Sequence, residues 1–361
     1  MGKWGWVQPE YRKFEPFHTP FTALFLKVSH KPMELLLHAG SSRKVEQRWV
    51  TIPSPGGEMQ MLISEPKDTD ETLPLMIYTH GGGFGFGAAP QHRWMNALFA
   101  REANCRVLMP DYRLLPEHPY PAAREDDIAA YAWACEHAEE LHIDPERIAV
   151  GGESAGGALA IYLCRDAETR GLPAPKFQML IYPVADERME TESMKKYTDT
   201  PMWNAEHNAE MWRMYLEGKT CPEASPMEME LPKQLPLTYM EVAELDCLHD
   251  EGVAYARRLE EADKIIVLWF SPLVCLWRAV RRWQQNKGRV RESSAPGCEE
   301  KIDAEFVRWI LHDGRTAKKR AEMERIGEEY PEKYVMIRNQ RELDGFLEFI
   351  KSKDSRAGGA D

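Results

Sequence analysis

One serine stands in a G-E-S-A-G pentapeptide at residues 152–156, between an apolar run and a helix-like stretch. A serine hydroxyl can attack an acyl group when a very tight strand-to-helix turn holds it clear of the sheet, and small flanking residues permit such a turn. The helix start also brings backbone N–H groups near the charge that develops on the substrate oxygen. We therefore predict that Ser154 is a catalytic nucleophile. The alternative is a glycine-rich turn with an incidental serine.

A second glycine-rich stretch, H-G-G-G-F at residues 80–84, ends another apolar run. Consecutive glycines let the backbone approach a ligand with its N–H groups exposed. We predict that the N–H groups of Gly82, Gly83 and Ala155 bind an oxyanion, and losing one such donor typically costs on the order of 10²–10³ in rate. A phosphate loop is disfavoured because no Lys-Ser/Thr and no G-x-G-x-x-G helix start follows. His80 is expected to brace the loop.

Three motifs in order carry a family resemblance: H-G-G-G at residues 80–83, D-Y-R-L-L-P-E-H-P-Y-P-A at 111–122 and G-E-S-A-G-G at 152–157. Together they resemble the hormone-sensitive lipase family of α/β-hydrolases, over roughly residues 45–267. The resemblance implies an α/β-hydrolase fold, with a mostly parallel central sheet, helices on both faces and a helical cap. It implies a carboxylesterase or lipase that often acts on short-chain acyl esters and needs no metal or organic cofactor. It also implies a structural role for four residues of the second motif: Asp111, Arg113, Glu117 and His118.

The segment from Tyr239 to Glu251 is similar to the family stretch D-x-L-x-D-E, whose first Asp orients the catalytic histidine. That position is Asp246. The order serine, acid, histidine is the chain order of α/β-hydrolases. The alternative for this acidic stretch is a solvated charge run.

The general base is the difficulty, because a serine without an imidazole is a poor nucleophile at neutral pH. The family histidine lies in a His-Gly-Phe stretch after one further strand. Residues 265–267 could form that strand, but no His-Gly-Phe follows. Only His249 and His312 come after Asp246, and His249 is too near the acid to reach between it and Ser154. His312 is therefore the candidate base, and a structural histidine is the alternative.

The elements that must position these residues are short apolar runs alternating with helical stretches, which predicts buried parallel strands joined by helices. We expect N-terminal cap helices in residues 1–45 and a core in 46–267 with a cap insert at about 195–217. The helices around residues 17–37 and the insert should roof a substrate pocket. Its candidate lining residues are Phe84, Phe86, Met202, Trp203, Met211 and Trp212. Plain core packing is the alternative for them.

The end of the chain has a different composition. Residues 268–300 are basic and rich in tryptophan, and residues 301–361 are charged and helix-prone. The basic segment begins where the family resemblance stops. One hypothesis is that it is not native to the domain, as after translation of a non-coding insertion or a slip of reading frame.

Charge and cysteine usage limit the classes of partner. The 361 residues include 46 Lys and Arg against 58 Asp and Glu, a net charge of −12, which disfavours nucleic acid. Seven scattered cysteines with no C-x-x-C pair argue against a disulfide framework or a zinc site and favour a reducing, cytoplasmic compartment. No apolar run reaches the roughly 20 residues of a membrane span. We expect a small-molecule ester as substrate, and a homo-oligomer is left open.

Two functions of different classes follow. The first is a serine carboxylesterase that forms an acyl-enzyme on Ser154, with acyl transfer to an alcohol or amine as its variant. The second is a catalytically impaired or silent small-molecule-binding homologue that lacks the catalytic histidine.

Overall fold

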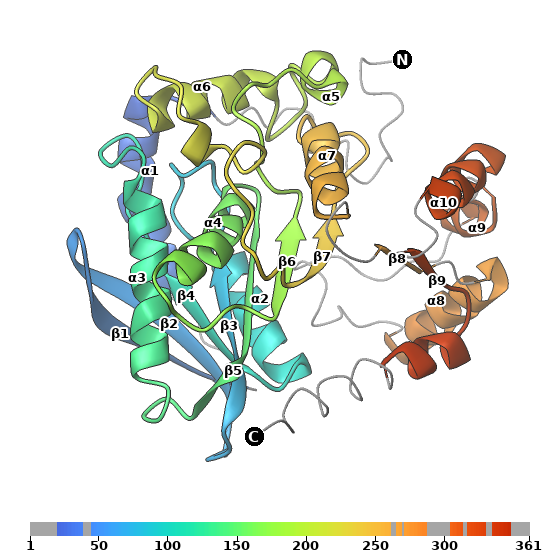
Figure 1. Ribbon diagram of the computed structural model, residues 1–361, viewed down its shortest axis with the longest axis horizontal. Coiled ribbons are helices and arrows are strands. Elements are labelled where there is room, and N and C mark those ends of the chain that lie inside the picture. The colour runs from blue at the N-terminus through green and yellow to red at the C-terminus, as the bar shows by residue number, and fades with distance from the viewer. Residues whose placement is uncertain are drawn as a thin grey trace. The chain divides into compact units, whose positions relative to one another are not determined.

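The computed structural model describes residues 20–38, 45–260, 265–268, 271–286, 304–312, 316–329 and 334–347 (Figure 1). The chain divides into two compact units, Met1–Leu259 and Glu260–Asp361. Of the residues predicted to do chemistry, all but His312 belong to the first unit. Residues 1–19 of the expected N-terminal cap and residues 287–300 of the basic segment lie outside the described residues.

A seven-stranded sheet forms the centre of the first unit, in the order β1-β2-β4-β3-β5-β6-β7. The first two strands form an antiparallel hairpin, β2 runs antiparallel to β4, and the pairs from β4 to β7 are parallel. The prediction of a mostly parallel sheet is confirmed. The strands are β1 (Val45–Ser54), β2 (Gly57–Pro66), β3 (Leu73–Thr79), β4 (Arg106–Pro110), β5 (Ile143–Glu153), β6 (Phe177–Ile181) and β7 (Leu237–Glu241).

Helices cover both faces of this sheet (Figure 1). Because side chains alternate along a strand, Leu75 and Ile77 of β3 pack with α3 and α4, whereas Met76 and Tyr78 pack with α2. The helices of the first unit are α1 (Ala23–His38), α2 (Pro90–Glu102), α3 (Ala122–Glu136), α4 (Ala155–Thr169), α5 (Glu192–Lys196), α6 (Ala205–Tyr215) and α7 (His249–Glu260). The expected insert at 195–217 therefore contains α6 and the last residues of α5.

Helix α4 is apolar around most of its circumference, which is typical of a helix enclosed by a core. It follows β5 with a single residue, Ser154, between them. The neighbouring strand β3 is in parallel register with β5, with Thr79 opposite Gly152. Since the carboxyl ends of parallel strands meet at one edge, the loop after β3 and the turn after β5 lie side by side there.

The second unit contains its own two-stranded parallel sheet, of β8 (Ile265–Leu268) and β9 (Tyr334–Ile337). Its helices are α8 (Pro272–Asn286), α9 (Ala304–Leu311) and α10 (Ala317–Glu329). Residues 265–267, which the predicted core included, belong to β8 of this unit, and β9 near the end of the described residues supplies their hydrogen-bonding partner. That residues 268–300 are not native stays a hypothesis.

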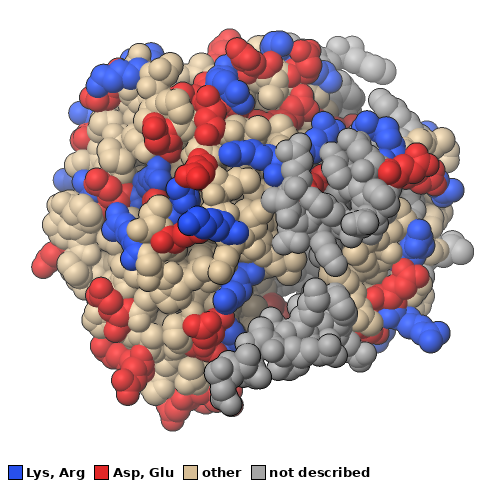
Figure 2. Space-filling model, in the orientation of Figure 1, with Lys and Arg blue, Asp and Glu red and all other residues tan. Residues whose placement is uncertain are grey.

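In the described ranges, no helix combines the length and the apolar character that crossing a bilayer requires. The six cysteines in those ranges form no disulfide with one another. On the side of the first unit that Figure 2 shows, acidic and basic side chains are interspersed and no broad basic patch forms.

Candidate active site

Ser154 occupies a strained turn between β5 and α4, with φ 55° and ψ −120°. Its N–H donates to the Ile181 carbonyl (2.9 Å), and its own carbonyl accepts from Val184 (3.0 Å). A Cβ on Gly156 would overlap the Thr79 carbonyl, and one on Gly152 would overlap Gly156. A positive φ at a non-glycine residue persists only where the surroundings impose it. Here the surroundings do impose it, because the turn packs so closely against the β3 backbone that Gly152 and Gly156 have no space for a side chain.

The glycine loop after β3 contacts this turn directly. Gly82 and Gly83 have φ of 120° and 59°, values that glycine adopts without strain. A Cβ on Gly81 would lie 3.2 Å from Ser154 Cβ. In the described part of the chain, the N–H groups of Gly82, Gly83 and Ala155 donate to no protein acceptor. The three predicted oxyanion donors therefore lie near the predicted nucleophile, and none of them donates to an acceptor among the described residues.

A cavity of about 720 Å³ opens over this turn. Its walls are mostly apolar and come from α1, the glycine loop, the start of α2, the cap insert and the loop after β7. It brings together seven of the residues predicted from sequence: Ser154, Gly82, Gly83, Asp246, Phe86, Met202 and Trp203. Three α1 residues that the sequence analysis did not name also line it: Phe25, Ser29 and Met33. Their spacing of four along a helix is the signal that could have identified them.

Three predicted pocket residues are corrected: Phe84, Met211 and Trp212 do not line this cavity. Phe84 is fully buried, and its ring stacks on Tyr215 at 4.0 Å. Met211 and Trp212 lie with Tyr215 on the buried face of α6. A Met and aromatic stripe at helical spacing is here core packing that fixes the cap, as the alternative interpretation held.

Asp246 lies in the loop between β7 and α7, half-buried at the cavity wall. Its Oδ1 accepts the Leu248 N–H at 3.0 Å. Burial raises the pKa of this carboxyl, and the backbone hydrogen bond partly offsets that rise. A carboxylate at this place in the cavity wall has the chemistry to accept a ring N–H of a histidine. The predicted role of orienting a histidine stays a prediction.

Among the described residues that line the cavity, His92 is the one imidazole, and both of its ring nitrogens are occupied. Nδ1 accepts the Ala89 N–H at 2.8 Å, so Nε2 carries the proton, which it donates to Glu153 at 2.9 Å. In this arrangement His92 cannot take a proton from Ser154. Sequence analysis missed His92 because no motif contains it.

The two histidines that follow Asp246 in the sequence lie in different elements and have different contacts. His249 opens α7, where its Nδ1 contacts Asp250 at 2.7 Å and it lines a separate cavity. His312 is exposed directly after α9 in the second unit, and its N–H donates to the Arg308 carbonyl at 2.8 Å. The structure thus does not bring an unoccupied imidazole to Ser154 within the described residues of the first unit. His312 as the base stays a prediction.

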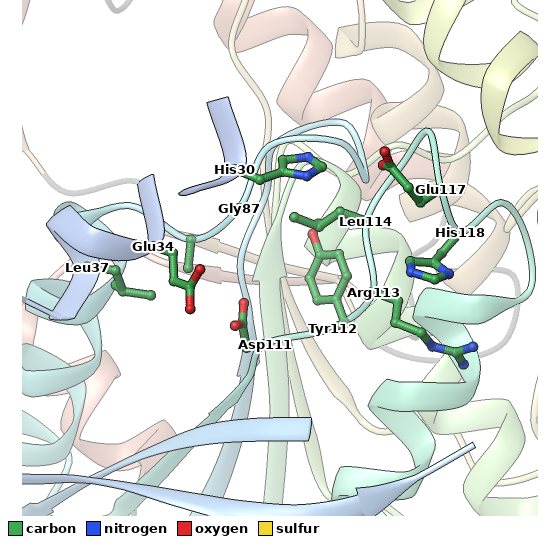
Figure 3. Close-up of a pocket in the computed structure, with 11 residues that line it drawn as sticks. His30, Glu34, Leu37, Gly87, Asp111, Tyr112, Arg113, Leu114, Glu117 and His118 are labelled. Carbon is green, nitrogen blue, oxygen red and sulfur yellow. The ribbon is translucent and has the colours of Figure 1, made fainter. Parts of the chain in front are cut away.

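A second cavity, of about 250 Å³, is lined by His30, Glu34 and Leu37 of α1 and by residues of the D-Y-R-L-L-P-E-H segment (Figure 3). Arg113 donates to Asp126 at 2.8 Å and Glu117 pairs with Lys27 of α1 at 3.0 Å. The Tyr112 hydroxyl donates to the His80 carbonyl at 2.9 Å. These contacts connect α1, α3 and the glycine loop, in agreement with a structural role for this motif.

The sequence matches the α/β hydrolase fold family over residues 76–268. Carboxylic ester hydrolase LipN of Mycobacterium tuberculosis is 37% identical over 228 residues, which are 61% of this chain and 60% of LipN. Ethyl acetate hydrolase of Pseudomonas putida is 34% identical over 223 residues, 60% of this chain and 70% of that enzyme. The crystal structure of esterase LipW from Mycobacterium marinum has a TM-score of 0.65 and 34% identity, covering 71% of this chain and 83% of LipW.

The aligned part therefore spans less than two thirds of LipN. The motifs, the sheet order and these matches agree with one another. The chain belongs to the α/β hydrolase fold family, and the relatives that it matches are named as ester hydrolases and esterases.

Proposed function

We propose that this chain hydrolyses carboxylic esters through an acyl-enzyme on Ser154. The observation that carries the proposal is the contact between the Ser154 turn and the glycine loop, in which the Gly82 and Gly83 N–H groups donate to no acceptor among the described residues. Relatives that are named carboxylic ester hydrolase, ethyl acetate hydrolase and esterase support it.

In the proposed reaction, Ser154 Oγ attacks the ester carbonyl and its proton passes to a histidine that Asp246 orients. The N–H groups of Gly82, Gly83 and Ala155 bind the oxyanion of the tetrahedral intermediate. The histidine then protonates the departing alcohol, which leaves an acyl-enzyme. Water attacks this ester with the same histidine as base, and the acid is released. His312 is the candidate for that histidine.

The cavity favours uncharged substrates. Its wall is mainly apolar, and the aromatic side chains Phe25, Phe86 and Trp203 lie on it. Glu153, the second carboxylate that lines it, is already paired with His92. A negatively charged acyl or alcohol group would lose its hydration here without gaining a counter-charge, because no Lys or Arg is among the described residues that line the cavity. Phe86, Met202 and Trp203 are proposed to contact the apolar part of the ester.

One observation favours the second candidate, a binding protein with little or no catalysis. Among the described residues of the first unit, His92 is the imidazole that lines the cavity, and both of its ring nitrogens are engaged. The Nδ1 of His249 contacts Asp250. Such a site would bind a small ester or a similar apolar ligand without turning it over.

Labelling with a fluorophosphonate probe separates the two candidates, because the probe reacts with an activated serine and needs no knowledge of the natural ester. We expect the full chain to be labelled and Ser154→Ala to lose labelling completely while retaining its circular dichroism spectrum. A folded wild-type chain that stays unlabelled contradicts the esterase proposal and supports the binding protein.

A further inference from the structure

Glu153, the residue before the nucleophile, is a buried carboxylate that three elements contact. It is 6% exposed. Its oxygens accept the Gly81 N–H at 2.8 Å, the His92 Nε2–H at 2.9 Å and the Tyr78 hydroxyl. Burial alone would raise its pKa, but the hydrogen bonds from His92, Gly81 and Tyr78 outweigh burial and hold the pKa below its ordinary value. Glu153 is therefore an ionised acceptor at neutral pH.

The His92 donor is itself fixed in one tautomer. Its Nδ1 accepts the Ala89 N–H at 2.8 Å, so a proton there would face a second donor. The proton must stay on Nε2, which points to Glu153. The start of α2 thereby fixes Nε2 as the ring nitrogen that donates to the carboxylate.

The peptide group that precedes the two predicted oxyanion donors is held at both ends. Its N–H, on Gly81, donates to Glu153, and its carbonyl, on His80, accepts the Tyr112 hydroxyl. The next two residues, Gly82 and Gly83, have positive φ. Downstream, the Gly82 carbonyl accepts the Gly85 and Phe86 N–H groups at 3.0 and 2.8 Å. The Gly81 anchor therefore restrains the upstream side of the loop and helps to fix where the Gly82 and Gly83 N–H groups point.

We propose that Glu153 is a positioning residue that fixes the glycine loop relative to the nucleophile turn, through Gly81, His92 and Tyr78. It acts through other groups and does not touch the reacting atoms. The inference rests on the proposed function, since an oxyanion site matters only if Ser154 is acylated. Preorganised donors contribute mainly to transition-state binding, so the loss of Glu153 should lower kcat and leave KM nearly unchanged.

The test compares wild type with Glu153→Gln in the full chain. A glutamine has one acceptor oxygen and an NH₂ donor, so it cannot accept from all three groups. We expect hydrogen exchange of the peptide containing residues 79–87 to accelerate about tenfold or more. On a short p-nitrophenyl ester we expect kcat to fall about tenfold to a hundredfold, with KM within about twofold.

Two further variants make the test specific. Asp166→Asn removes a carboxylate that accepts two bonds from Arg124 at 2.7 Å, on α4 away from the described cavity. It should lower stability without changing kcat or loop exchange. Tyr78→Phe removes one donor and keeps the carboxylate, so it should move kcat and loop exchange in the same direction as Glu153→Gln but by only about twofold to fivefold. If Glu153→Gln does not fold, Tyr78→Phe is the variant that tests the proposal.

The outcomes are distinguishable. Unchanged loop exchange in folded Glu153→Gln overturns the inference, as does a raised KM with kcat unchanged. Faster loop exchange in a chain whose wild type hydrolyses no ester overturns the proposed function while supporting the positioning role of Glu153.

Discussion

The candidate active site has a nucleophile end, formed by Ser154 and the glycine loop, and a base end, formed by Asp246 and the histidine that it is predicted to orient. The two ends are held in place by different means. At the nucleophile end, the turn at Ser154 and the loop at Gly82 and Gly83 pack against each other with no space for a Cβ on the neighbouring glycine Gly156. At the base end, Asp246 lies between β7 and α7, and His92, the imidazole among the described residues of the cavity, is engaged at both ring nitrogens. The first end depends on contacts that the core itself requires. The second depends on a histidine whose identity stays a prediction.

This difference teaches that parts of a catalytic site can be retained independently. The nucleophile turn and the glycine loop are fixed by core packing in this chain, because their glycines leave no space for a side chain. A histidine brought by a later segment contributes little to the core. Its position can therefore change while the other end of the site stays intact.

The largest effect should come from the candidate base. If His312 takes the Ser154 proton, His312→Ala should lower kcat/KM by about 10³-fold or more, because the unassisted hydroxyl is a poor nucleophile. The measurement is hydrolysis of a short p-nitrophenyl ester. Added imidazole should restore part of the activity of this variant and have little effect on wild type. Activity at the wild-type level in His312→Ala excludes this residue, and the base end then has to be sought elsewhere.

The next effect concerns the nucleophile end. Gly156→Ala should destabilise the first unit by about 3 kcal/mol or more, because the new methyl group overlaps the Thr79 carbonyl, which belongs to the backbone and cannot move aside. Urea unfolding followed by circular dichroism measures this. Gly87→Ala is the matched control, since its Cβ would meet only Leu114 at an ordinary 3.5 Å. Equal stability of the two variants would show that the turn is less constrained than its geometry indicates.

The smallest expected effect is on the pH dependence of stability. It distinguishes the two carboxylates that line the cavity with Ser154, which are Asp246 and Glu153. The pKa of Asp246 is raised above its ordinary 3.8 by burial, so its contribution to stability is present below that value and is lost as pH rises through the folded pKa. Asp246→Asn cannot ionise and its Oδ1 can still accept from Leu248. It should therefore be more stable than wild type by less than about 1 kcal/mol at pH 8, with the difference shrinking toward pH 4.

For Glu153 the sign is opposite. Its pKa lies below the ordinary 4.5, so its contribution is present above that value and is lost as pH falls through the folded pKa. Glu153→Gln should be less stable than wild type at pH 8 and should approach it in acid. Thermal unfolding at pH 4 to 8 compares the two variants, and slopes of the same sign would contradict the assignment.

Much of the first unit could be predicted from local patterns. The predicted alternation of buried strands and helices is found, for example in the succession of β5, α4 and β6, because short apolar runs and helical periodicity report burial directly. The pocket wall could be predicted only in part. Met211 and Trp212 have the composition of a pocket wall, yet helical geometry turns them toward the core, whereas Phe25 and Met33 of α1 face the cavity.

The amino-acid sequence by itself determined the nucleophile turn and the glycine loop, since residue size alone decides whether such turns can form. It also determined the family, through three motifs in order. Only the tertiary structure decided that Glu153 and His92 pair beside the serine, that this pairing occupies the imidazole, and that β8 joins β9. These facts depend on which distant segments meet. No local pattern encodes that, because it results from the packing of the whole unit.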